Sequence, residues 1–365
     1  MRLTFITHEL GCGGAERVLC VVANYWAERG HAVNIVTTSS APSSFSLHPG
    51  IRHTGLGLAG VSQNLQTAVV ANFRRLAALR RAVVQSKPQV VISFSFQSNV
   101  LTVLATRGLQ VPVVICEHTD TRRFQAGPLW RALQCMTYPL ADVVTCLTPN
   151  ILQDMQLLVG NRGLLLPNPI AVPPAQVSAP ELPAGNLLVA MGRLHPVKGF
   201  DSLLKAFAPL SPKHSDWHLL ILGEGSERER LQQLIHTLGL EGRATLYGRV
   251  NDPFPILRRA ELFVLSSSRE GFPMALCEAM ACGVPVVSFD CRSGPNYIIR
   301  NGHDGLLVPP GNVQSLSRSI ERLMIDDDER RRLGSNAREV VNRFSVETVL
   351  GMWSRMFSRL GVEQV

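Results

Sequence analysis

Two series of short, uninterrupted apolar runs constrain the fold of this chain more than any other feature. Each run has the length of a strand, and a turn and a helical pattern follow it. Runs without polar alternation indicate strands covered on both faces, as in parallel sheets connected by helices. The sequence therefore predicts an α/β protein with two doubly wound sheets. The runs lie at 3–7, 33–37, 90–94, 113–116 and 143–147, and at 187–191, 218–222, 244–247, 262–265 and 284–288.

A dense cluster of prolines separates the two series. Six prolines fall between residues 166 and 183, and proline is disfavoured both in helices and in central strands. A length of 365 residues is also more than one hydrophobic core usually fills. We therefore expect two domains, over residues 1–168 and 169–345, with a linker that begins near the boundary.

The charge of the chain is concentrated in its first half. Residues 1–168 carry +7 of the net charge of +8, which indicates that this half faces an acidic membrane surface, a phosphate-bearing substrate or nucleic acid. Aromatic residues make up only 6 % and do not alternate with the basic ones, which argues against nucleic acid. No apolar run is long enough for a signal peptide or a membrane span, so we expect a cytoplasmic protein.

A glycine-rich loop follows the first predicted strand. Gly11, Gly13 and Gly14 precede a helical pattern, and the free amides at a helix start attract phosphate oxygens. The spacing differs from that of a nicotinamide dinucleotide site, and no acidic residue follows the second predicted strand. The alternative for this loop is a tight turn that binds nothing.

Two further loops of this kind follow strands of the second half. One contains Gly192, Arg193 and Lys198, whose two cations could neutralise a diphosphate without a metal. The next contains Gly223 and Gly225, a second set of backbone amides that could face the same ligand. Cations on a loop are often merely solvated, and this remains the alternative for Arg193 and Lys198.

The strongest group of candidate residues lies between 266 and 280. Pro273 suits the first position of a helix, whose free amides would include those of residues 271–275. Glu278 lies inside this otherwise apolar helix, where a carboxylate needs hydrogen-bond donors such as ribose hydroxyls or a paired arginine. Glu270 in the loop could accept hydrogen bonds from sugar hydroxyls or offset charge at an anomeric carbon.

These motifs together resemble retaining glycosyltransferase family 4, which has the GT-B fold. Glu270 and Glu278 match the two acids of its Glu-x7-Glu signature, and the other landmarks follow in the family's order and spacing. The resemblance covers nearly the whole chain. It implies two Rossmann-like domains that face a central cleft, with a final helix at about 346–365 that packs back on the first domain. The other landmarks are Gly192-Arg193, Lys198-Gly199, Gly223-Glu224-Gly225 and Gly302-x-x-Gly305-Leu306.

The resemblance also implies roles for individual residues. The first domain would bind the acceptor and the second the nucleotide sugar, with Glu270, His118, Arg193 and Lys198 as the catalytic residues. His118 would lie beside the reacting sugar, although a lone histidine is more often an ordinary loop residue. No metal or other cofactor is expected. The donor-binding residues would be Gly13, Gly14, Gly192, Arg193, Lys198, Gly223, Gly225, Glu270, Gly271, Phe272, Pro273, Met274 and Glu278.

One position departs from the family pattern. The family usually has an acid before an Ile-Ile pair, and this chain has Tyr297 there, followed by Ile298 and Ile299. Whatever the acid does to orient the donor must here be done differently. This is the one feature that favours a catalytically silent membrane-docking scaffold over an enzyme.

The acceptor side is marked by a basic amphipathic pattern at residues 69–84. Taking about 100° per residue, Val69, Phe73, Leu76, Leu79 and Val83 fall on one predicted face. Arginines lie opposite or on the flank, either solvated or in contact with anionic lipid or a lipid diphosphate. We expect membrane or acceptor contact from Arg74, Arg75, Arg81, Arg122 and Arg123, with Arg131 extending the patch.

The sequence thus predicts an enzyme that moves a hexose or N-acetylhexosamine with retention from a nucleoside diphosphate sugar, most simply a UDP-sugar. The stretch 288–295 resembles family members that extend polyprenyl-diphosphate-linked glycans in surface polysaccharide assembly. The expected partners are the sugar nucleotide, the lipid-linked glycan and the anionic cytoplasmic face of the inner membrane. Besides the silent scaffold, the alternative is a sugar-nucleotide epimerase of the same fold.

Overall fold

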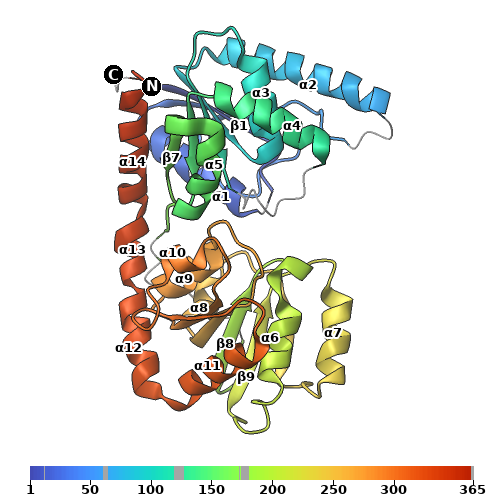
Figure 1. The fold of residues 1–365 in the computed structure, drawn as a ribbon, viewed down its shortest axis with the longest axis vertical. Helices are drawn as coiled ribbons and strands as arrows, with labels where there is room; N and C mark the ends of the chain where they lie inside the picture. Colours follow the sequence, from blue (N-terminus) through green and yellow to red (C-terminus); the bar gives the residue numbers. More distant parts are fainter. Residues whose placement is uncertain (12, 61–64, 119–126, 172, 174–180, 363–365) are drawn as a thin grey trace. The chain divides into compact units, whose positions relative to one another are not determined.

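The chain folds into two compact units (Figure 1). The computed structural model describes residues 1–11, 13–60, 65–118, 127–171, 173 and 181–362. Unit 1 comprises Met1–Pro169 together with Val349–Val365, and unit 2 comprises Ile170–Thr348. The first crossing between the units lies one residue beyond the boundary expected from the proline cluster.

Unit 1 is built on a seven-stranded parallel sheet in the order β3-β2-β1-β4-β5-β6-β7. β2 and β3 extend the sheet on one side of β1, and β4 to β7 extend it on the other. The direction in which strands are added therefore reverses between the neighbours β1 and β4, and the loops that follow these two strands diverge. All five predicted strands of the first half are present. β3 and β7, the edges of the sheet, were not predicted. The strands are β1 (Arg2–Thr7), β2 (Ala32–Thr37), β3 (Arg52–Gly55), β4 (Val90–Phe94), β5 (Val113–Glu117), β6 (Val143–Cys146) and β7 (Gly163–Leu165).

Helices cover both faces of this sheet. α2 and α3 pack on one face through a cluster that includes Leu79, Val83 and Leu101. α1 and the C-terminal helix α14 meet through Trp26 and Phe357, whose rings lie 5.5 Å apart. The helices of unit 1 are α1 (Gly14–Glu28), α2 (Leu65–Ser86), α3 (Phe96–Thr106), α4 (Pro128–Thr137), α5 (Pro149–Val159) and α14 (Val346–Arg359), with short 3-10 turns η1 (Tyr138–Leu140) and η2 (Gly160–Arg162).

Unit 2 is built on a six-stranded parallel sheet in the order β10-β9-β8-β11-β12-β13. Its winding reverses between β8 and β11. The five predicted strands of the second half are again present, and the edge strand β13 was missed. The strands are β8 (Asn186–Met191), β9 (Trp217–Leu222), β10 (Ala244–Gly248), β11 (Ala260–Leu265), β12 (Val286–Phe289) and β13 (Leu306–Val308).

The core of unit 2 joins the sheet to α6, α7 and α11. These helices contribute Leu203, Leu231 and Leu316, respectively, to one buried cluster. This cluster fixes the strands, and with them the loops at the ends of the strands. The helices are η3 (Pro196–Lys198), α6 (Phe200–Phe207), α7 (Arg228–Thr237), α8 (Phe254–Leu257), α9 (Met274–Ala281), α10 (Pro295–Ile298), α11 (Val313–Ile325), α12 (Asp327–Ala337) and α13 (Glu339–Phe344).

Candidate functional site

The donor-binding candidates of unit 2 lie on loops at one edge of its sheet. Open parallel sheets bind ligands beyond the carboxyl ends of their strands, at the point where the winding reverses. In unit 2 this point lies between β8 and β11. The loop after β8 carries Gly192 to Gly199, and the loop after β11 carries Ser266 to Pro273. The fold therefore brings these two candidate loops together.

An ion pair joins the two loops. Lys198 Nζ lies 2.6 Å from Glu270 Oε1, and the Glu270 side chain is only 9 % exposed. The stem of Lys198 lies against Gly192, where a Cβ atom would be 3.4 Å from the lysine Cδ. A cation and a carboxylate are thus fixed side by side at the switch point.

Backbone hydrogen bonds hold the loops in register behind this pair. The amide of Ser268 donates to the carbonyl of Val197 at 2.9 Å, and Ser266 Oγ donates to the carbonyl of Lys198 at 2.9 Å. Gly199 has a φ of +62°, and a Cβ atom there would lie 2.2 Å from the carbonyl oxygen of Ser266. Glycine is therefore required where the two loops touch.

The glycines after β9 pack against the loop after β8. A Cβ atom on Gly225 would lie 2.3 Å from the carbonyl oxygen of Leu194, and one on Gly223 would lie 1.9 Å from that of Gly192. The amide of Leu194 in turn donates to the carbonyl of Glu224 at 2.9 Å. The structure thus brings Gly223 and Gly225 to Gly192 and Arg193, and it shows that close backbone packing alone already requires glycine there.

The second acid of the signature lies on α9, inside unit 2. Glu278 is 4 % exposed on the second turn of the helix. Pro273 has extended backbone angles and precedes the helix, so the expectation that it is the first helical residue was wrong by one position. Pro273, the residue before the helix, provides no side-chain cap, and the backbone amides of the first turn carry the positive end of the helix dipole.

Phe272 contributes its backbone, not its ring, to the loop surface. It is 6 % exposed, and its ring meets that of Phe344 edge-on at 5.2 Å. Tyr297, at the position of the usual family acid, packs on the same Phe344 ring at 5.6 Å. Met274 is half-buried at the start of α9, whereas Arg193 is exposed on its loop.

The loop after β12 packs against the loop that carries Gly271 and Pro273. Ser293 Oγ donates to the carbonyl of Gly271 at 3.2 Å. Gly294 has a φ of +95°, and a Cβ atom there would lie 2.6 Å from Cδ of Pro273. The loop after β12 therefore fixes the backbone around Gly271 and Pro273.

The remaining candidates of the first domain lie in unit 1. Gly13 precedes α1, which begins at Gly14, and the carboxylate of Glu16 lies where a side chain of Gly13 would be. His118 directly follows β5, and its ring stacks on that of Phe94 at 5.0 Å and 29°. Burial lowers the pKa of His118 to about 4. The imidazole is therefore neutral near pH 7, a hydrogen-bond partner and not a cation.

The basic helix differs in part from its prediction. Leu79 and Val83 are buried as expected, but Phe73 is 69 % exposed, so its placement on the buried face was wrong. At about 100° per residue Phe73 lies about 120° from Leu79, beyond the sector that the sheet covers. Arg74 and Arg81 are exposed. Arg75 instead donates to the carbonyls of Leu58 and Gly60, at 2.9 and 2.7 Å.

Two predicted acceptor contacts, Arg122 and Arg123, lie outside the described residues, whereas Arg131 is exposed on α4. Among the described residues no helix is both long and apolar enough to cross a membrane. In the same part of the chain no three His, Cys, Asp or Glu side chains are grouped so as to hold a metal ion.

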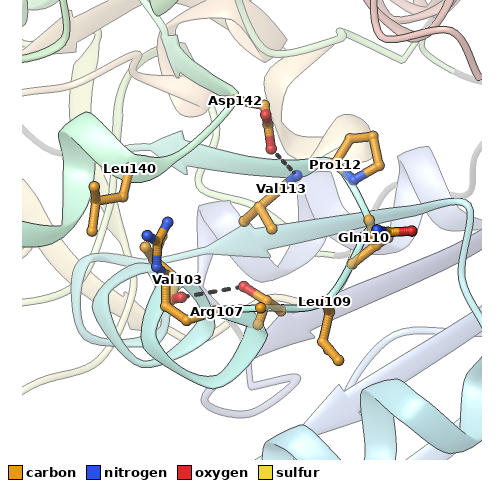
Figure 2. A pocket seen from close by; sticks show the side chains of 11 residues that line it. Val103, Arg107, Leu109, Gln110, Pro112, Val113, Leu140 and Asp142 are labelled. Carbon is orange, nitrogen blue, oxygen red and sulfur yellow. Dashed lines mark hydrogen bonds between the residues drawn. The ribbon is translucent and has the colours of Figure 1, made fainter.

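A pocket of unit 1, about 350 Å³ in volume, lies away from the candidate residues (Figure 2). It is lined by residues 106–113 with Val103, Leu140 and Asp142. Figure 2 shows Asp142 directed to the backbone of Val113, whose amide donates a hydrogen bond of 2.8 Å to the Asp142 carboxylate. Val113 begins β5, so the pocket lies at the amino end of this strand, opposite to the end that carries His118.

Comparison with known families accounts for both units. Residues 13–169 match the model of the glycosyl transferase 4-like domain, and residues 178–340 match that of glycosyl transferases group 1. Together the two models span most of the chain. The chain belongs to glycosyltransferase family 4. It has the GT-B fold of this family, as the resemblance of its motifs implied.

The relatives of this family 4 enzyme agree with that assignment. A Campylobacter jejuni relative is 28 % identical over 99 % of both chains, and it is named as a GalNAc-α-(1→4)-GalNAc-α-(1→3)-diNAcBac-PP-undecaprenol α-1,4-N-acetyl-D-galactosaminyltransferase. Sucrose-phosphate synthase from Thermosynechococcus elongatus has a TM-score of 0.85 and 20 % identity, over 98 % of both chains. Anabaena HepE in complex with UDP has a TM-score of 0.79 and 20 % identity, over 98 % of this chain and 100 % of HepE.

Proposed function

We propose that this glycosyltransferase moves a hexose or N-acetylhexosamine, with retention, from a UDP-sugar to a polyprenyl-diphosphate-linked glycan. The product would serve exopolysaccharide, O-antigen or glycoprotein glycan assembly. The observation that carries the proposal is the Lys198–Glu270 pair at the switch point of unit 2. The name of the C. jejuni relative, which this chain matches from end to end, supports the acceptor class.

On this proposal the donor diphosphate binds between cations and helix amides. Lys198 exchanges Glu270 for a phosphate oxygen, and exposed Arg193 on the same loop supplies a second cation. The amides of residues 271–274 lie at the start of α9, where the helix dipole favours an anion. These groups neutralise the leaving diphosphate, so the proposed reaction needs no metal.

The transfer itself is proposed to need no protein base. The bond from the anomeric carbon to the diphosphate oxygen breaks, and the acceptor oxygen bonds to that carbon from the same face. The proton of the acceptor hydroxyl passes to the departing phosphate oxygen. Glu270, released by Lys198, accepts hydrogen bonds from the donor sugar, and Glu278 accepts them from the ribose. Neutral His118 forms a hydrogen bond with the sugar or with the acceptor.

This function can be tested by incubating the full chain with a bacterial lipid extract and, in turn, each of a panel of radiolabelled UDP-hexoses and UDP-N-acetylhexosamines. We expect counts in the lipid phase with one donor, an anomeric configuration equal to that of the donor, and the same rate in EDTA. Free sugar product without lipid would favour the epimerase. No consumption of any donor would favour the silent scaffold, and a rate abolished by EDTA and restored by manganese would end the metal-free mechanism.

We further propose that α2 holds the enzyme on the cytoplasmic face of the inner membrane. At about 100° per residue, Val70, Phe73, Arg74, Arg81 and Val84 fall within a sector of about 100°. Val70 is 51 %, Phe73 69 % and Val84 52 % exposed, and both arginines are exposed. An exposed stripe of apolar side chains beside two arginines suits the boundary between acyl chains and anionic headgroups.

Replacing two exposed arginines of α2 in Arg74→Gln/Arg81→Gln should weaken binding to vesicles that contain phosphatidylglycerol about 10- to 30-fold. Each arginine near an anionic surface contributes about 1 kcal/mol. Arg355→Gln/Arg359→Gln removes the same charge from exposed positions of another unit 1 helix. Cosedimentation of this control should match the wild type. Equal losses for the two double variants would mean that only net charge matters and that α2 is not the docking surface.

A further inference from the structure

Three aromatic rings from distant parts of the sequence form a stack in unit 1. The His118 ring lies on Phe94 at 5.0 Å, and Phe94 lies on Trp353 at 6.4 Å with only 10° between the ring planes. Phe94 is fully buried and Trp353 is 2 % exposed. Ring centroids between about 4.5 and 7 Å apart are in contact. The ring of Trp353 therefore packs against Phe94, the ring on which His118 stacks.

The three rings come from different elements. His118 follows β5, and Phe94 ends the neighbouring strand β4. Trp353 lies on α14, the helix drawn in red whose label stands above that of α13 (Figure 1). Phe94 also contacts Phe5 of β1 at 6.4 Å. The support of His118 thus depends on a helix that reaches unit 1 only after the chain has passed through unit 2.

We propose that Trp353 is a positioning residue for the transfer reaction, because through Phe94 it fixes the plane of the His118 ring. This inference rests on the proposed role of His118 as a hydrogen-bond partner of the sugar or the acceptor. A hydrogen bond from an imidazole is directional, so a rotated ring would misplace it. Among the described residues Trp353 contacts Phe94, and Phe94 contacts His118.

Burial also determines the charge state of His118. Burial lowers the pKa of His118 to about 4, raises that of Cys116 to about 12, and raises that of Tyr138 well above its usual value. Tyr138 donates a hydrogen bond to the buried carboxylate of Glu117 at 2.8 Å. Removing the indole would admit water beside Phe94 and reduce the desolvation of His118. Since desolvation disfavours the imidazolium, the pKa of His118 would then rise.

The test compares Trp353→Leu and Trp353→Phe with Trp26→Leu in the full chain. Trp26 is also 2 % exposed in unit 1, and its ring contacts Tyr25, His31 and Phe357 but not Phe94. Phe357 in turn contacts Trp353 at 5.9 Å. The control therefore removes an equally buried indole that does not contact Phe94 and lies one ring beyond Trp353. Melting temperature, kcat and donor KM are measured for each variant. The His118 ring is titrated by NMR, with His118→Gln assigning its signal.

For Trp353→Leu we expect kcat to fall about 10- to 100-fold, with donor KM within about twofold of the wild type. The pKa of His118 should rise by about one unit, so the acid limb of the rate profile moves to higher pH. Trp353→Phe should restore most of kcat, and Trp26→Leu should keep kcat at a similar loss of melting temperature. Equal kcat losses for both Leu variants, or an unchanged His118 titration, would overturn the proposal. Full kcat in His118→Gln would instead refute the role proposed for His118.

Discussion

Lys198→Ala is expected to lower kcat/KM for the sugar nucleotide about 1000-fold. Lys198 Nζ lies 2.6 Å from Glu270 at the switch point of unit 2. On the proposed mechanism it stabilises the charge that develops on the leaving diphosphate. Removing one preorganised group of this kind typically costs a factor of 100 to 1000, and here the remaining Glu270 carboxylate would also repel the phosphate. Initial rates in the lipid-phase assay measure the loss.

Lys205→Ala is the matched control for this prediction. Lys205 pairs with Asp201 on the exposed surface of α6 at 3.4 Å, and such pairs contribute little to stability. Its kcat/KM should equal that of the wild type. A value for Lys198→Ala within about tenfold of the wild type would contradict the proposed role of Lys198.

Glu270→Gln separates the two roles of the ion pair. In the free enzyme Glu270 competes with the diphosphate for Lys198, so neutralising it should tighten the binding of UDP several-fold. The same change should slow transfer, because the amide accepts a weaker hydrogen bond from the donor sugar than the carboxylate does. Calorimetry with UDP and the lipid-phase assay measure these opposite effects. Weaker binding of UDP by Glu270→Gln would mean that the pair only orders the loops.

Central strands could be predicted from the sequence because helices cover both of their faces. Ile92 of β4 and Val189 of β8 are fully buried, and such positions leave long apolar runs. The missed strands are edges. Three of the four residues of β3 are exposed and the fourth is half-buried, so its sequence, Arg52-His53-Thr54-Gly55, carries no apolar pattern. Hydrogen bonds to β2 define this strand, and composition does not reveal them.

The candidate site was predictable where motifs lie on loops at the ends of the strands. Lys198 and Glu270 were assigned to one ligand from two separate motifs, and the fold places them in contact. Tertiary packing decided the rest. Phe272 directs its ring toward Phe344, and Arg75 is held by the carbonyls of another loop. The resemblance implied that the final helix packs back on the first domain, but no local pattern specifies that Trp353 packs on Phe94.

Gly223→Ala is expected to destabilise unit 2 by more than about 4 kcal/mol. Gly223 has a φ of +144°, and a Cβ atom there would lie 1.9 Å from the carbonyl oxygen of Gly192. Relief requires backbone movement, which would break hydrogen bonds such as that from the Gly223 amide to the carbonyl of Gly248, 2.8 Å long. A strained backbone and lost buried hydrogen bonds add to each other. Urea unfolding of the full chain measures the loss.

Gly239→Ala distinguishes this steric effect from the backbone strain alone. Gly239 also has a positive φ, of +66°, but nothing lies within 4 Å of its would-be Cβ atom. Alanine there should cost only about 1 kcal/mol. A much larger loss for Gly223→Ala would mean that this glycine is required mainly so that the loop after β9 can pack against the loop that carries Arg193. Equal losses would mean that the two loops can move apart, and that close packing does not explain a glycine at position 223.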